Sequence, residues 1–440
     1  MSEEYGLARA RTSQEGRPPV ENRGGMLFFG GVSASELLEK YGSPLYVYDE
    51  RRIRDNYSRI LNAFRRHEPD FGLHYAIKAN NNLAIMRILE REGSSVDASS
   101  PAEIYLARKA GFGDDRILYS GNYHTDDELR LACESGIRLN LDSTEQMERI
   151  IAMDLRPKTV SFRINPLIGS GGHERLIFAG PEVKFGIREQ EAGQAYLLAR
   201  KHGVEGFGIH MMTGSNILDH GYFGLITDRL MGIAKGISEK AGVAFSFIDI
   251  GGGLGVPYRP EDQLLDIDAA AEAVSAAFRK GCAASGLRDA KLLMEPGRYI
   301  VCDSGVLLAR VHSIKRSDKL FVGTDAGMNT LLRPALYGAY HPVLVANRLD
   351  ETDAEEATIV GQICENTDHL AKDRMLPKVA RGDIIALMNA GAYGFAMSSQ
   401  YNTRPRAAEV LVSGGRHELI RRRESLGDID RDMVVPQRLK

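Results

Sequence analysis

The stretch LHYAIKANNN, residues 73–82, places a lysine at the end of a β-forming run. An ammonium group is costly to bury, because it must be paired or lose its proton when it leaves water. Most lysines are exposed, so Lys78 alone is also compatible with the surface end of a strand. The surrounding pattern decides between a surface lysine and a functional one.

Short apolar runs alternate with amphipathic helical segments on both sides of this stretch. Eight strands are predicted, starting at residues 73, 94, 116, 138, 159, 206, 245 and 291. Segments such as NLAIMRILEREG (82–93) carry apolar residues at helical spacing and stop at glycine. Eight such units over about 250 residues favour an α/β fold, a (β/α)8 TIM barrel, although an open doubly wound sheet has a similar pattern.

The pattern of predicted secondary structure changes after residue 303. Strand-like runs with short turns replace the helical pattern, which predicts a C-terminal all-β barrel domain over residues 304–440. The (β/α)8 barrel is assigned to residues 45–303, and residues 26–44 are predicted to join the β domain. Residues 1–25 are polar, charged and rich in glycine and proline, so we expect them to be disordered.

Composition argues against several classes of function. The chain has 440 residues, of which 43% are hydrophobic and 26% charged, as in soluble globular proteins. A formal net charge of -3 without a basic run argues against nucleic acid or an anionic membrane as partner. We find neither a signal-peptide core nor an apolar stretch near the ~20 residues that span a bilayer. Four cysteines in a chain of this length do not form a disulfide framework, which predicts a reducing, cytoplasmic location. Their spacing does not match that of metal ligands, so no metal site is predicted.

Unusual residues follow the predicted strands at their C-terminal ends, where barrel enzymes carry functional side chains. Lys78 ends the first strand, His210 and Met212 the sixth, Gly251–Gly253 the seventh, and Glu295–Arg298 the eighth. Consecutive glycines expose N–H groups to a phosphate, and an arginine adds a fixed charge. Each feature alone is weak, since glycines after a strand are more often a tight turn. Their convergence on one rim favours a phosphate-bearing ligand.

A lysine, a phosphate site and a carboxylate on one rim are what pyridoxal 5'-phosphate requires. The lysine holds this cofactor as a Schiff base, and an acidic partner keeps the ring nitrogen protonated. Lys78 and Glu295 are the candidates for these two roles. The sequence therefore predicts pyridoxal 5'-phosphate as the cofactor, with Lys78 inside the barrel at a strand end.

Seven motifs in order along the chain carry a resemblance to a known family. They are YAIKAN (75–80), GGGLG (251–255), EPGR (295–298), DAGMN (325–329), RPALYGAYH (333–341), CENTD (364–368) and GAYG (391–394) followed by YNTRPRAAEVLV (401–412). Together they resemble the fold-type III pyridoxal-phosphate-dependent decarboxylases, and within that family the diaminopimelate decarboxylases.

The resemblance implies decarboxylation of meso-2,6-diaminopimelate to L-lysine and CO2 by a homodimer with shared active sites. By motif, Lys78 binds the cofactor covalently, Glu295 pairs with the ring nitrogen, and Cys364 donates a proton from the other subunit. The implied cofactor-binding residues are Lys78, Ser215, Gly251, Gly252, Gly253, Glu295, Gly297, Arg298 and Tyr393. The implied substrate-binding residues are Arg298, Arg333, Tyr337, Glu365 and Tyr393.

One residue departs from the family pattern. Met212 stands where the family usually has a histidine stacked on the cofactor ring. His210 lies two residues earlier on the same strand face, ~7 Å away, and so cannot take that place. Related decarboxylases for other amino acids also lack this histidine, which leaves a different or carrier-bound amino acid open as the substrate.

Two further alternatives stay open. An amino-acid racemase of the same fold suits a weak electron sink, whereas a carboxylate such as Glu295 makes a strong one. A catalytically inactive homologue that binds a partner protein would have no need of both Lys78 and Cys364. The polar set formed by Arg298, Arg333, Tyr337 and Glu365 suits a second amino-acid head on the substrate.

Overall fold

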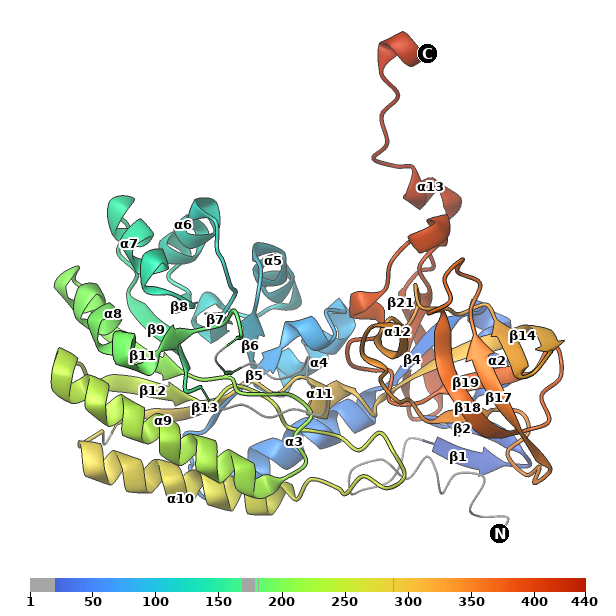
Figure 1. The fold of residues 1–440 in the computed structure, drawn as a ribbon, viewed down its shortest axis with the longest axis horizontal. Coiled ribbons are helices and arrows are strands. Elements are labelled where there is room, and N and C mark those ends of the chain that lie inside the picture. Colours follow the sequence, from blue (N-terminus) through green and yellow to red (C-terminus); the bar gives the residue numbers. More distant parts are fainter. Residues whose placement is uncertain (1–19, 168–178, 181, 288) are drawn as a thin grey trace. The chain divides into compact units, whose positions relative to one another are not determined.

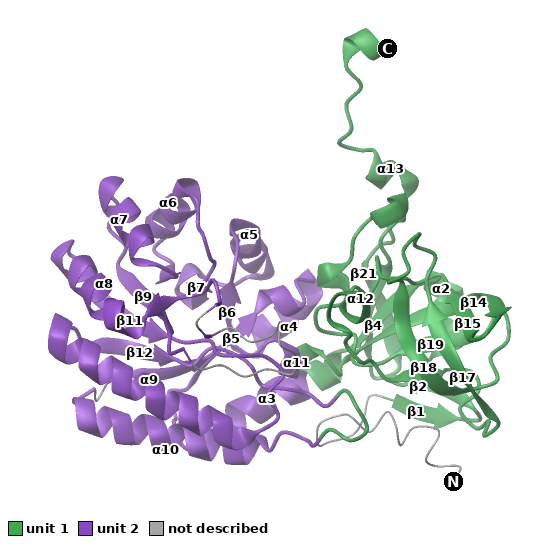
Figure 2. Cartoon of the chain, in the orientation of Figure 1, with its two compact units in different colours: residues 1–53, 258–262, 301–440 green, residues 54–257, 263–300 purple. Residues whose placement is uncertain are grey.

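The computed structural model describes residues 20–167, 179–180, 182–287 and 289–440. The chain divides into two compact units (Figure 2). Unit 1 comprises residues 1–53, 258–262 and 301–440, and unit 2 comprises residues 54–257 and 263–300. Most of the N-terminal segment expected to be disordered lies outside the described residues, and from residue 20 onward the chain forms a strand.

Unit 2 contains a closed ring of eight parallel strands (Figure 1). The order around the ring is β9-β11-β12-β13-β5-β6-β7-β8, and pairing of β8 with β9 closes it. The strands are β5 (Gly72–Ala76), β6 (Ser95–Ala98), β7 (Ile117–Tyr119), β8 (Arg138–Leu141), β9 (Thr159–Asn165), β11 (Gly206–His210), β12 (Phe245–Asp249) and β13 (Lys291–Met294). The predicted barrel is confirmed, and its closure excludes the open doubly wound sheet. A two-residue strand, β10 (Ile187–Arg188), adds to β9 outside the ring.

In chain order, a helix follows each of the first seven strands of the ring, from β5 to β12. They are α4 (Leu83–Arg91), α5 (Pro101–Ala110), α6 (Asp126–Ser135), α7 (Thr144–Ala152), α8 (Glu189–Lys201), α9 (His220–Ala241) and α10 (Ile267–Ser285). Local sequence sets their ends: Thr125 and Glu128 form a capping box at the start of α6, and Gly136 ends it in a left-handed conformation. The eighth strand differs from the expected pattern, because only α11 (Arg298–Val301) follows it, while α3 (Glu50–Arg65) precedes β5.

Unit 1 is built from two β-sheets. The smaller contains β1 (Val20–Arg23), β2 (Met26–Phe29) and β3 (Val32–Ser33). The nine strands of the larger are β4 (Leu45–Asp49), β14 (Gly305–Arg316), β15 (Leu320–Thr324), β16 (Val343–Val345), β17 (Ala354–Val360), β18 (His369–Pro377), β19 (Ile384–Leu387), β20 (Ala408–Ser413) and β21 (Arg416–Arg421). Its helices are α2 (Ala34–Tyr41), α12 (Arg333–Tyr337) and α13 (Leu426–Ile429). Leu27 and Phe29 of β2 pack into one apolar core with residues of β4, β14 and β20.

Strand β4 differs from its expected place. Residues 45–49 were predicted to begin the barrel, whereas β4 pairs with β14 on one side and β20 on the other, both in unit 1. All five residues of β4 are buried, as in a central strand with both faces covered. Its partners lie more than 250 residues away in the sequence, where a local pattern carries no information about them.

The remaining described elements are short. Single 3-10 turns occur at η2 (Ile77–Ala79), η3 (Asp114–Arg116), η5 (Phe395–Met397), η6 (Tyr401–Thr403) and η7 (Gln437–Leu439). Within the described part of the chain, every helix is too short or too polar to cross a membrane. The turns η2 and η6 carry candidate site residues.

Candidate active site

Lys78 lies in the turn η2, directly after β5. Its Nζ is 2.7 Å from Oδ2 of Asp97, a fully buried residue on the neighbouring strand β6. The Lys78 side chain itself is 44% exposed, which is more than the sequence analysis expected for a lysine inside the barrel. The lysine therefore reaches the open end of the ring while a buried carboxylate holds its amino group.

Asp97 is a site residue that the sequence analysis missed. It accepts hydrogen bonds from Lys78 and from the hydroxyl of Ser120. Burial and the charge of Glu295 raise the pKa of Asp97, while Lys78 and Ser120 act in the opposite direction. An acid within the otherwise apolar and small run SSVDAS was the signal that would have revealed it.

A second cluster of buried polar groups lies at the ends of three neighbouring strands. His210 ends β11, Asp249 ends β12, and Glu295 follows β13 directly. One polar atom from each lies within 4.8 Å of the other two. His210 Nε2 is 3.3 Å from Glu295 Oε2. Asp249, which the sequence analysis did not single out, accepts a hydrogen bond from the N–H of Gly251 at 2.8 Å.

The pKa values of the two carboxyl groups of this cluster are shifted in opposite directions. Burial alone would raise the pKa of Glu295, but the interaction with His210 and the charge of Lys78 lower it to about 2. Burial and the charge of Glu295 raise the pKa of Asp249 well above its usual value. Two close carboxyl groups whose pKa values are driven apart in this way have different roles in a site. Glu295 is therefore the stronger acid of the two and Asp249 the weaker one.

The glycine turn after β12 lets other backbone approach closely. Gly251 and Gly253 have φ values of +69° and +101°, a region that other residues rarely adopt. A Cβ at Gly252 would lie 2.5 Å from the carbonyl oxygen of Glu295, and one at Gly253 would lie 2.9 Å from that of Gly214. The turn is therefore closed to side chains, and the N–H groups of Gly251 and Gly252 are held by Asp249 and Met212.

A charged donor lies next to this turn. Nη2 of the buried Arg298 donates to Oγ of Ser215 at 3.2 Å. Ser215 is adjacent to Gly214, which packs against the glycine turn. A guanidinium, a hydroxyl and a glycine turn together form a cradle for an anion. A Cβ at Gly297 would lie 2.8 Å from the Cβ of Ala79. The EPGR turn (295–298) therefore packs closely against the residue that follows Lys78.

These residues fit pyridoxal phosphate. Glu295 Oε1 and Asp249 Oδ2 are buried and accept no hydrogen bond from an N–H or hydroxyl group of the described residues. The two carboxyl groups interact with each other through a side-chain hydrogen bond, and the negative charge that remains on Glu295 suits a further cationic donor, such as a protonated ring nitrogen. The anion cradle suits the phosphate, and Lys78 supplies the amine.

Met212 lies on the glycine turn and is half-buried. Its Sδ accepts a hydrogen bond from the N–H of Gly252 at 3.2 Å. The preceding residue, Met211, is fully buried, so the two methionines point to opposite sides of the strand end. Met212 thus faces the glycine turn rather than the packed interior.

Cys364 and Glu365 lie in the segment between β17 and β18 of unit 1, and both are exposed. Asn402 of η6 binds this segment twice: it accepts from the Cys364 N–H at 3.1 Å and donates to Cys364 Sγ at 3.1 Å. Tyr401 donates to Oε1 of Glu365. Tyr401 and Asn402 were not predicted as site residues, although both belong to the motif YNTRPR, and they hold the thiol and the carboxylate in place.

Arg333 and Tyr337 are the first and last residues of α12 in unit 1. Arg333 is buried, and its Nη1 donates to Nε2 of His341 at 2.9 Å, while Nδ1 of His341 donates to the carbonyl oxygen of Met388. Tyr393 has a φ of +56°, a left-handed conformation that is strained for a side chain of this size. The predicted site residues thus form one group at the barrel end and a second group within unit 1.

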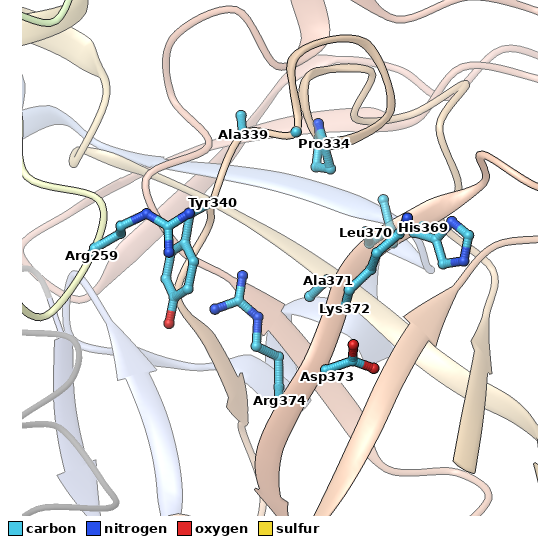
Figure 3. Close-up of a pocket in the computed structure, with 11 residues that line it drawn as sticks. Arg259, Pro334, Ala339, Tyr340, His369, Leu370, Ala371, Lys372, Asp373 and Arg374 are labelled. Carbon is cyan, nitrogen blue, oxygen red and sulfur yellow. The ribbon is translucent and has the colours of Figure 1, made fainter. Parts of the chain in front are cut away.

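Unit 1 also has a pocket of about 390 Å³ (Figure 3). Arg259, Lys372 and Arg374 give its wall a positive charge, and the Arg374 guanidinium carbon lies 3.3 Å from the Tyr340 ring centroid. Its described lining residues include none of the site residues predicted from sequence.

A barrel that carries a lysine, an anion cradle and an ionised carboxylate at the ends of its strands is the architecture of a pyridoxal-phosphate enzyme. The family model described as "Pyridoxal-dependent decarboxylase, pyridoxal binding domain" matches residues 50–302. The class is therefore a pyridoxal-dependent decarboxylase.

Relatives place the chain more narrowly. It is 50% identical, over 96% of its length and 99% of the relative, to a diaminopimelate decarboxylase of Methanothermobacter thermautotrophicus. It is 43% identical, over 94% of its length and 98% of the relative, to one of Archaeoglobus fulgidus. The crystal structure of the diaminopimelate decarboxylase of M. jannaschii in complex with L-lysine matches with a TM-score of 0.89 at 34% identity, covering 96% and 99% of the two chains. The chain belongs to the diaminopimelate decarboxylase family.

Proposed function

We propose that this protein decarboxylates meso-2,6-diaminopimelate to L-lysine and CO2 with pyridoxal 5'-phosphate as cofactor. The single observation that carries the chemistry is the buried Glu295, which lies directly after β13 at the end of the ring and 3.3 Å from His210, with its pKa lowered to about 2. The family supports the substrate, and two solved relatives contain L-lysine, the expected product.

Different residues of unit 2 are assigned to different parts of the cofactor. Lys78 would hold it covalently, Arg298, Ser215 and the Gly251–Gly253 turn would hold its phosphate, and Gly297 would admit the EPGR turn close to the lysine. When bound, pyridoxal phosphate supplies an electron sink for the pair released from the Cα–carboxylate bond. Glu295 stabilises a proton at the ring nitrogen, because an ionised carboxylate favours a positive N–H group beside it.

The residues of unit 1 are assigned to the substrate and to proton transfer. Arg333 and Tyr337 are assigned to the distal carboxylate together with Arg298, which belongs to unit 2. Glu365 is assigned to the distal amino group, and Tyr393 to contact with cofactor and substrate. Cys364 donates the proton to Cα from the partner subunit of a homodimer. The contacts of Asn402 and Tyr401, which hold Cys364 and Glu365 in fixed positions on an exposed segment, support this role. We assign the enzyme to the cytoplasm, in keeping with its four free cysteines.

One observation favours a second candidate. Met212 stands in the place of the family's ring-stacking histidine and lies on the glycine turn. A side chain without a charge or proton there suits a decarboxylase of the same mechanism that acts on a different or carrier-bound amino acid.

The deciding experiment measures CO2 release and product identity from meso-diaminopimelate, lysine, ornithine and glutamate at equal concentration. We expect L-lysine from diaminopimelate, with the other three amino acids at least about 100-fold slower, because a site built to bind a polar group rejects analogues that leave it unpaired. Equal or faster release from any of the other three would overturn the assignment.

A further inference from the structure

Four buried polar side chains form a hydrogen-bonded chain across the interior of the barrel, ending at Glu295. The hydroxyl of Ser161 on β9 donates to Oδ1 of Asn140 on β8 at 2.8 Å. Nδ2 of Asn140 lies 3.3 Å from Nδ1 of His210 on β11, and Nε2 of His210 lies 3.3 Å from Oε2 of Glu295. All four residues are at most 5% exposed.

The donor and acceptor roles of these groups follow from their chemistry. An amide NH2 group only donates, so the His210 nitrogen that faces it, Nδ1, must offer a lone pair. A neutral imidazole then carries its single proton on Nε2, and that N–H points at the carboxylate of Glu295. The Ser161 hydroxyl donates to Oδ1 of Asn140, which leaves the NH2 group of this amide facing the ring.

We propose that Asn140 is a positioning residue that holds His210 as the neutral tautomer with its proton on Nε2. His210 then donates a hydrogen bond to Glu295 without bringing a second proton into the cluster. The inference deepens the proposed function, because it identifies the residue that controls how many protons the Glu295 pair contains.

The count of charges explains why the second proton matters. With a neutral His210, the hydrogen bond from Nε2 and the charge of Lys78 still favour the ionised form of Glu295, so the pair carries one negative charge, which favours a proton on the cofactor's ring nitrogen. A doubly protonated His210 would neutralise the pair and weaken that preference. A less protonated ring is a poorer electron sink, so decarboxylation would slow.

Other titratable groups surround Glu295, and their residues are not replaced in the Asn140 variants. They are His74 on β5, Lys78 and Asp97 at the ends of β5 and β6, Arg163 on β9 and Asp249 on β12. Because none of them is altered, a comparison of Asn140 variants isolates the contribution of His210.

The test uses the full chain labelled with ¹⁵N-histidine, with and without pyridoxal phosphate, near neutral pH. The His210 nitrogen signals are assigned by their loss in His210→Gln. We expect a proton on Nε2 and none on Nδ1 in the unaltered protein. In Asn140→Asp, a carboxylate accepts from Nδ1, so both nitrogens should carry protons. In Ser161→Ala, the amide is released and a mixture of tautomers should appear.

Controls and kinetics separate positioning from structural damage. Asn56→Asp buries a carboxylate at a similarly buried site on α3 and should leave the His210 signals unchanged. In Asn140→Asp, kcat for CO2 release should fall about 10-fold or more with little change in KM, since a poorly tuned proton position affects the chemical step. If Asn140→Asp does not fold, Asn140→Leu removes the donor without adding a charge and should give mixed tautomers.

Two results would overturn the inference: a proton on Nδ1 of His210 in the unaltered protein, or His210 signals that do not respond to any Asn140 variant. Neither measurement requires turnover. A chain that shows the expected tautomer but releases no CO2 from diaminopimelate would therefore contradict the proposed function while leaving the hydrogen-bond assignment intact.

Discussion

The Nζ atom of Lys78 lies 2.7 Å from Oδ2 of Asp97, so the amine that would hold the cofactor is paired with a fully buried carboxylate. The pairing reconciles two opposing demands. A lysine at the open end of a barrel is mobile unless something holds its amino group, and a buried carboxylate is unfavourable unless a cation or donor faces it. Asp97 fixes the position of the Lys78 amino group, and Lys78 supplies the cation that a buried carboxylate requires.

Lys78→Ala should abolish covalent cofactor binding and leave the fold intact. The side chain is half-exposed, so little packing is lost, and Asp97, whose pKa is already raised, can take up a proton. The measurement is intact mass after borohydride reduction in the presence of pyridoxal phosphate. Lys280→Ala is the matched control, since Lys280 also pairs with an aspartate, Asp228, at 2.8 Å. A reduced adduct in Lys78→Ala would show that another lysine is the attachment point.

Glu295→Gln should retain cofactor but slow decarboxylation by ~10²-fold, because a neutral amide no longer stabilises the proton at the ring nitrogen. Steady-state CO2 release measures the loss, and the absorbance of bound cofactor reports its retention. Glu128→Gln, in the capping box of α6, serves as the control and should keep full activity. A rate near that of the unaltered enzyme would exclude Glu295 from contact with the ring nitrogen.

Asp249→Asn should be more stable than the unaltered protein, and the difference in stability should grow as the pH rises. Burial and the charge of Glu295 raise the pKa of Asp249 well above its ordinary value. The folded state therefore binds this proton more tightly than the unfolded state, so stability is greatest at acid pH and falls as the pH rises from about 3.8 through the raised native value. An amide has no proton to lose, and its oxygen can still accept from Gly251. Melting temperatures of both proteins across pH should diverge in favour of the variant as the pH increases, and parallel curves would contradict the raised pKa.

Lys78→Ala and Cys364→Ala should complement each other if Cys364 acts across a dimer interface. Each homodimer lacks one essential group, but a mixed dimer has one site with both groups intact. Random exchange makes about half of the dimers hybrids with one good site each, so about a quarter of full activity should return, by the two-fold symmetry of such an interface. Activity is measured after subunit exchange has been verified by mass. No recovery would mean that Cys364 acts in its own subunit or not at all.

Met212→His should be tolerated, because Met212 is half-buried on the glycine turn and not in the packed interior. Met211→His is the matched control: Met211 is fully buried, so a polar ring there should destabilise the fold by about 3 kcal/mol. Melting temperature and the absorbance of bound cofactor are the two measurements. A large stability loss in Met212→His with an unchanged cofactor spectrum would show that Met212 does not contact the ring.

Local sequence was enough to predict eight strand–helix units and the end of the strands that carries the chemistry, whereas the pairing of β8 with β9 decided for a closed barrel over an open sheet. Strand and helix periodicity, with caps such as Thr125 and Gly136, identify each element over a few residues. In a closed parallel barrel the C-terminal ends of all strands lie at one end. Lys78, Glu295 and Arg298, each placed just after a strand, were therefore predicted to converge without knowledge of any long-range contact.

Contacts between residues far apart in the chain were decided only by the tertiary structure. Strand β4 pairs with segments more than 250 residues away, Asp97 becomes the partner of Lys78, and Asn402 binds Cys364 across 38 residues of sequence. The pKa values of Asp249 and Glu295 diverge because both are buried near His210 and each other, a relation that no spacing in the sequence encodes. Periodicity reports which face of an element is buried, whereas burial depth, hydrogen-bond partners and charge depend on which other elements pack against that face.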